Sequence, residues 1–80
     1  MKITIESTEK MVEIANGGDT VPARVWDGKT DAGVPVIAFI TRISPRIPLN
    51  DPRQQDFQRE LKETRAPSAD TQAIPLRMIL

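Results

Sequence analysis

The sequence predicts an α+β domain, in which an antiparallel sheet of about four to five short strands carries one helix, at about 52–64, packed on one face. Two observations favour this class. Apolar and polar residues alternate through much of the first 43 positions, with the period of two that is typical of strands. The clearest helix-start signal follows a proline-rich segment in the second half of the chain. A chain of 80 residues is long enough for one domain, which we place at 1–80.

The segment 21–43 is expected to form the central hairpin of the sheet. Its turn, Thr30–Gly33, combines an aspartate that can bond its own backbone with a glycine that accepts positive φ. On the first strand, alternation places Arg24 and Trp26 on the face opposite Val25. The return strand is apolar on both faces, which predicts a central position in the sheet.

The N-terminal region is expected to supply the neighbouring strands. Residues 2–6 and 10–14 both alternate, so they form two short strands or one bent strand. The sequence Asn-Gly-Gly-Asp at 16–19 is the strongest turn signal in the chain, and it should join 10–15 to 21–28 as an antiparallel pair. Pro22 cannot donate a hydrogen bond, so it belongs at a strand start or on an open edge.

The predicted helix begins after Asp51. Asp51 suits the N-cap and Pro52 the first helical position, while Gln54 could complete a capping box. Phe57 and Leu61 form the entire apolar stripe, so two side chains would anchor the helix on the sheet.

The C-terminal residues predict a further strand and an oligomer. After a loop with a helical turn capped by Ser68, residues 74–80 read as a last strand, inserted in the sheet or paired across a subunit boundary. The hydrophobic fraction is 39%, more than one helix would cover. We therefore expect a homodimer or larger closed oligomer.

The composition argues against several function classes. The chain has no His, Cys or Tyr, so the usual general base and the thiolate nucleophile are missing, and we expect no enzymatic activity, no metal site and no cofactor. Asp27 and Asp31 are expected to be solvated turn residues. Eleven basic and eleven acidic residues cancel, which argues against non-specific nucleic-acid binding. With no cysteine and no membrane or secretory signal, the sequence favours a cytoplasmic protein.

The candidate binding residues are cationic and aromatic. Trp and Arg are enriched at binding hot spots, because Trp buries a large rigid surface and Arg makes directed bonds to carboxylate or phosphate. In the alternative interpretation, Trp26 is a core residue that packs under the helix against Phe57, and Arg24 only covers it. The candidates are Arg24, Trp26, Arg42 and Arg46, with Arg77 as a possible addition.

The segments VPARVWDGKTDAGVPVIAFITRI and APSADTQAIPLRMIL resemble a group of short accessory proteins of temperate bacteriophages and prophages. The resemblance covers nearly the whole chain. It implies a bacterial cytoplasm as the working compartment and interference with host machinery or antiviral defence. Two hypotheses follow: a protein that docks on a host protein through Arg24 and Trp26, or an oligomeric sponge whose arginines hold an anionic nucleotide-like signalling molecule.

Overall fold

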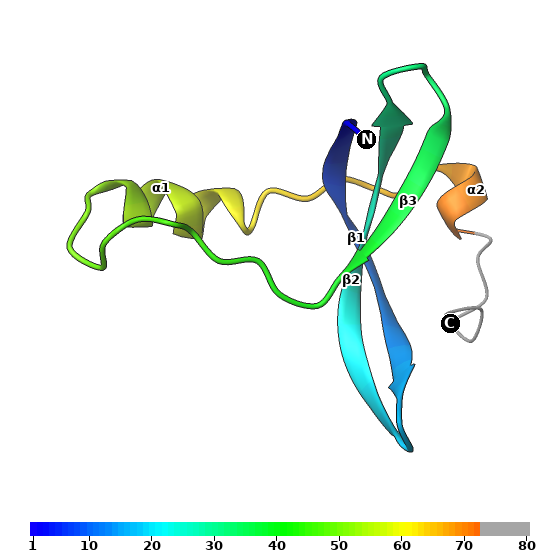
Figure 1. Ribbon diagram of the computed structural model, residues 1–80, viewed down its shortest axis with the longest axis horizontal. Coiled ribbons are helices and arrows are strands. Elements are labelled where there is room, and N and C mark those ends of the chain that lie inside the picture. The colour runs from blue at the N-terminus through cyan, green and yellow to red at the C-terminus, as the bar shows by residue number, and fades with distance from the viewer. Residues whose placement is uncertain (73–80) are drawn as a thin grey trace.

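The described part of the chain folds as a three-stranded antiparallel sheet followed by two short helices. The computed structural model describes residues 1–72 (Figure 1). The α+β class is confirmed, but the predicted four to five strands are more than the three strands found. The predicted strand at 74–80 and Arg77 lie outside the described residues. The elements are β1 (Ile3–Asn16), β2 (Asp19–Thr30), β3 (Pro35–Ile40), α1 (Arg53–Glu60) and α2 (Ala69–Gln72).

Both predicted turns are present. Gly17 and Gly18 have φ of 58° and 99°, values that an L side chain rarely adopts, and they connect β1 to β2 antiparallel as expected. In the second turn Gly33 has φ of 86°, and its N–H donates to the carbonyl oxygen of Thr30 at 2.9 Å. The glycines therefore fix the order and register of all three strands.

The centre of the sheet is β2, not the return strand of the 21–43 hairpin. The strand order is β1-β2-β3, so the prediction of a central return strand was wrong. The two apolar faces of β3 have different surroundings. Phe39 contacts the core on one face, while Ile40 lines a groove on the other.

β1 is one bent strand with a bulge. Ser7 pairs with Trp26 and Met11 pairs with Arg24, so the three residues 8–10 face Val25 alone. The bulge is tied down by the buried Thr8, whose hydroxyl donates to the Val25 carbonyl oxygen at 2.6 Å. The same hydroxyl oxygen accepts the backbone N–H of Lys10 at 3.3 Å.

Pro22 lies within β2, where the strand is open on one side. β3 pairs with β2 only from Arg24 to Lys29. Backbone groups alternate between the two neighbours of a strand, and this alternation directs the nitrogen of Pro22 to the side where β3 has already ended. The predicted placement on an open edge is therefore confirmed.

The core is small and lies on the Val25 face of the sheet. Its fully buried apolar members are Val12, Ala23 and Val25, against which Ile14 and Phe39 pack. This outcome matches the alternation read from the first strand of the hairpin, with Val25 inside and Arg24 and Trp26 on the opposite face.

The helix is shorter and less packed than predicted. α1 covers Arg53–Glu60 rather than 52–64, contains no buried residue and extends away from the sheet (Figure 1). Two apolar anchors are too few to lay a helix across a sheet face. The N-cap is Pro52 rather than the predicted Asp51, and it has no side chain that can cap the helix. The Asp51 carboxylate, one position earlier, still accepts the Arg53 backbone N–H at 2.8 Å. The expected capping box does not form, because the Gln54 side chain donates to the Pro48 carbonyl oxygen instead.

Candidate binding groove

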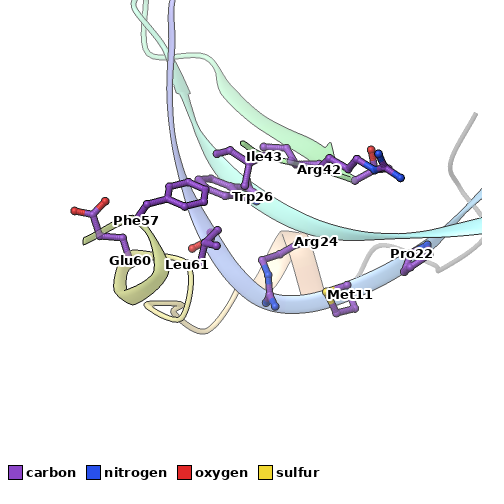
Figure 2. Close-up of a pocket in the computed structure, with 12 residues that line it drawn as sticks. Met11, Pro22, Arg24, Trp26, Arg42, Ile43, Phe57, Glu60 and Leu61 are labelled. Atoms are coloured by element: carbon purple, nitrogen blue, oxygen red, sulfur yellow. The ribbon is translucent and has the colours of Figure 1, made fainter. Parts of the chain in front are cut away.

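A groove lies between the sheet and α1 on the face that carries Trp26. Its volume is about 350 Å³, within the range of ligand-binding pockets. Figure 2 shows Phe57, Glu60 and Leu61 approaching from the helix side. We call it the Trp26 groove, and its lining comes from β1 (Ser7, Met11), β2 (Pro22, Arg24, Trp26), the end of β3 and the following segment (Ile40, Thr41, Arg42, Ile43), and the α1 region (Phe57, Glu60, Leu61).

Most of the lining is apolar and open to solvent. Met11, Ile43 and Leu61 are all exposed, although each is a large hydrophobic side chain. Trp26 and Phe57 are half-buried and line the same groove (Figure 2). Trp26 is not part of the buried core of Val12, Ala23 and Val25, as the core interpretation would have required, although it shares the groove with Phe57.

The two groove arginines differ in how they are held. Arg24 Nη1 donates to the carbonyl oxygen of Thr8 at 2.7 Å, so this guanidinium is bonded to the bulge of β1. Arg42 is exposed and forms no ion pair with the side chains that the structure describes. Glu60 lies across the groove from Arg42 (Figure 2). One rim is therefore positive and the other negative.

The structure brings together three of the four predicted site residues. Arg24, Trp26 and Arg42 line the groove, and Arg46 does not. Arg24 and Trp26 are two positions apart on one strand, which alternation predicts, and Arg42 joins them because the chain bends after Ile40. Arg46 lies further along the proline-rich segment, where the sequence gives no period from which to place it.

An ion pair missed by the sequence analysis lies on the opposite face. Asp27 is only 6% exposed, so the prediction of a solvated turn residue was wrong. Its carboxylate accepts a hydrogen bond from Arg65 Nη2 and the backbone N–H of Ser68, the latter at 3.1 Å. Arg65 also contacts Glu6, with 3.1 Å from Nε to Oε2. Strand alternation could have predicted this burial, because Asp27 is two positions after the buried Val25 and therefore lies on the same face of β2.

Arg65 also pairs through its backbone. Its carbonyl oxygen accepts the Glu9 N–H at 2.9 Å and its N–H donates to the Ser7 carbonyl oxygen at 3.2 Å, which forms a parallel bridge at Thr8. The predicted helical turn follows, with the Ser68 hydroxyl accepting the Thr71 N–H at 3.3 Å. Segment 65–68 thus ties α2 to the sheet on the face that the groove does not use.

Other site chemistries find no support in the part of the chain that is described. Residues 1–72 contain no cluster of three or more His, Cys, Asp or Glu side chains that could hold a metal ion. Among the same residues, no helix has the length and hydropathy needed to cross a membrane. The chain matches no protein-family model, no curated protein and no solved structure. The chemistry of the groove is therefore the basis for a functional proposal.

Proposed function

We propose that this is a non-enzymatic binding protein that docks another protein in the Trp26 groove. The observation that carries the proposal is the gathering of Trp26, Phe57 and exposed aliphatic side chains around one cavity of about 350 Å³. Burial of an aromatic side chain among such neighbours is typical of hot spots at protein interfaces. The matching occupant is an apolar side chain of a partner protein.

The charges on the two rims define the partner further. Arg42 has no acidic partner among the described side chains, so it can receive a carboxylate beside the apolar anchor. A nucleotide-like anion fits the groove less well. Arg24 is already bonded to Thr8, Arg46 lies elsewhere and Glu60 would repel the phosphates. The rims therefore favour a polypeptide over the small anion of the sponge hypothesis.

The biological setting of the proposal comes from the resemblance to accessory proteins of temperate phages. In that setting the partner is a host protein in the bacterial cytoplasm, and docking interferes with host machinery or antiviral defence. The absence of His, Cys and Tyr supports binding rather than catalysis as the mode of interference. We further propose that the working form is a closed oligomer.

Leu61 and Leu49 provide a matched test. Both side chains are exposed, but only Leu61 lines the groove. Proteins captured from a bacterial lysate are purified, and their affinity is measured by calorimetry with the wild type, Leu61→Asp and Leu49→Asp. We expect Leu61→Asp to weaken binding by about tenfold or more and Leu49→Asp to leave it unchanged. Trp26 is the only tryptophan, so its fluorescence should change on binding to the wild type.

Two outcomes would overturn the proposal. One is a purified partner that binds Leu61→Asp as tightly as the wild type, with no change in Trp26 fluorescence. The other is a chain that captures no protein but retains a small anionic molecule, which would favour the sponge. Circular dichroism of both variants controls for folding.

A further inference from the structure

Within residues 1–72 no strand pairs with the outer edge of β3, and β3 has no charged residue. Among residues 1–72, β2 is the only strand that pairs with β3. β3 has the sequence PVIAFI, with its single proline at the first position. Sheet edges in monomeric proteins are commonly protected by charge, proline or a bulge, and residues 36–40 have none of these devices.

The other edge strand has two of these devices, a bulge and charged residues. β1 is bulged at residues 8–10, and segment 65–68 bridges to it at Thr8. Its sequence is also charged, with Glu6, Glu9, Lys10 and Glu13. A neutral strand can pair with a copy of itself without repulsion between like charges, which a charged strand cannot. This contrast selects β3 as the edge for self-association.

Apolar side chains at β3 stay uncovered. Within residues 1–72 the fully buried apolar core consists of Val12, Ala23 and Val25, while Ile37 in β3 and Val34 just before it are 38% and 55% exposed. Pairing with a second copy along β3 would bury part of this apolar surface.

We propose that two copies of this chain pair antiparallel through β3 to form a continuous six-stranded sheet. Thr30 donates to the Val34 carbonyl oxygen, so by alternation the N–H and C=O groups of Ile37 and Phe39 point outward. Pro35 also faces outward but has no N–H, which disfavours a register centred on Ile37. Centring the two-fold axis on Ala38 pairs Ile37 with Phe39 of the partner subunit, and every outward N–H of Ile37 and Phe39 then finds an acceptor.

The dimer is tested with two matched isoleucines on the outer strands. Ile37 in β3 is 38% exposed and Ile3 in β1 is 44% exposed, so either accepts a lysine at the surface. By sedimentation equilibrium at micromolar concentration we expect a wild-type mass twice the 8.9 kDa of one chain. Ile37→Lys should sediment as one chain, whereas Ile3→Lys should remain dimeric.

Amide hydrogen exchange on the unmodified protein provides the second measurement, which holds even if Ile37→Lys fails to fold. The N–H groups of Ile37 and Phe39 should be protected in the dimer and lose protection on dilution. A monomeric wild type overturns the proposal, and so does a dimer in which these two amides exchange freely. Protection of the two amides in a monomer would mean that the chain covers its own edge, which also contradicts the proposal. A dimer lost in Ile3→Lys but kept in Ile37→Lys would place the interface on β1.

Discussion

Asp27 is the residue whose environment departs most from its sequence context. It precedes Gly28 and Lys29, a sequence typical of a turn, but it lies within β2 and is buried. Its negative charge is compensated by Arg65 and by the N–H of Ser68. A buried carboxylate that loses a charged donor retains its desolvation cost without the compensating bond.

Arg65→Gln should therefore lower the free energy of unfolding by about 2 kcal/mol in urea denaturation. Arg59→Gln is the matched control, because Arg59 is exposed on α1 and pairs with Asp56 and Glu63 at the surface. We expect it to change the free energy by less than about 0.5 kcal/mol. If the two substitutions have equal effects, Arg65 does not compensate Asp27 in solution. Adding Asp27→Asn to Arg65→Gln should recover part of the loss.

Gly28 is required for a reason other than turn formation. A Cβ at this position would overlap the Thr4 carbonyl oxygen and lie 2.7 Å from the Ile5 Cα, and both atoms belong to the backbone of β1. Gly28→Ala should destabilise the fold by about 3 kcal/mol or more, because β1 would have to move away from β2. In Gly33→Ala the new Cβ meets no atom within 4 Å, and only the positive φ opposes it. That control should cost about 1 kcal/mol, and an equal cost at Gly28 would contradict the close approach of the strands.

At the scale of elements, α1 is held at its start by charge. The Asp51 carboxylate accepts hydrogen bonds from the Arg53 guanidinium, with 2.7 Å between Nη2 and Oδ2, and from the Arg53 backbone N–H. The side-chain bond to Arg53, more than the backbone bond, lowers the pKa of Asp51 below its ordinary value. A lowered pKa in the folded state means that the carboxylate stabilises the helix start at pH values above the ordinary Asp range. This stabilisation is lost as the pH falls through the lowered pKa.

We expect the Arg53 amide resonance to move upfield in acid as Asp51 is protonated, with a midpoint below the ordinary Asp range. Added salt should reduce the effect, since the Arg53 side chain is exposed. Asp51→Asn provides the control, because its Arg53 amide should not titrate. An Arg53 amide shift in the wild type that does not change with pH would show that the carboxylate is not bonded to it.

The sequence predicted the turns better than the role of each strand. Gly17 and Gly33 adopt positive φ, which glycine accepts without steric cost, so the local sequence was sufficient to place both hairpin turns. The position of β3 was predicted wrongly, because a strand with apolar residues on both faces was taken as central, whereas in the structure one face contacts the core and the other lines the groove at an edge strand. The length of α1 was overestimated because its two apolar anchors could not extend the helix by packing.

For the whole molecule, the sequence predicted those candidate site residues that lie on a strand, where side chains alternate between the two faces. Arg24 and Trp26 share a face by alternation, and both line the groove. Arg42 and Arg46 follow the bend after β3, where no period applies, and only Arg42 reaches the groove. The pair of Asp27 with Arg65 joins residues 38 positions apart, a separation at which a single sequence gives no pairing information. Long-range pairing is therefore the part of this fold that required a structure.

The bulge in β1 restricts which changes in chain length the sheet can tolerate. Residues 8–10 lie opposite the single residue Val25, so β1 has two residues more than β2 over this stretch. Side chains alternate with a period of two, so an even number of extra residues leaves the faces of β1 unchanged. Ile3 and Ile5 before the bulge lie on the same face as Met11 after it, which is the groove face. Val12 and Ile14 lie on the opposite face, in the core. Deleting one residue from 8–10 would turn one half of β1 over and send either Val12 or Ile5 to the wrong face. Deleting two would leave both halves in place, so this strand can lengthen or shorten only in steps of two residues.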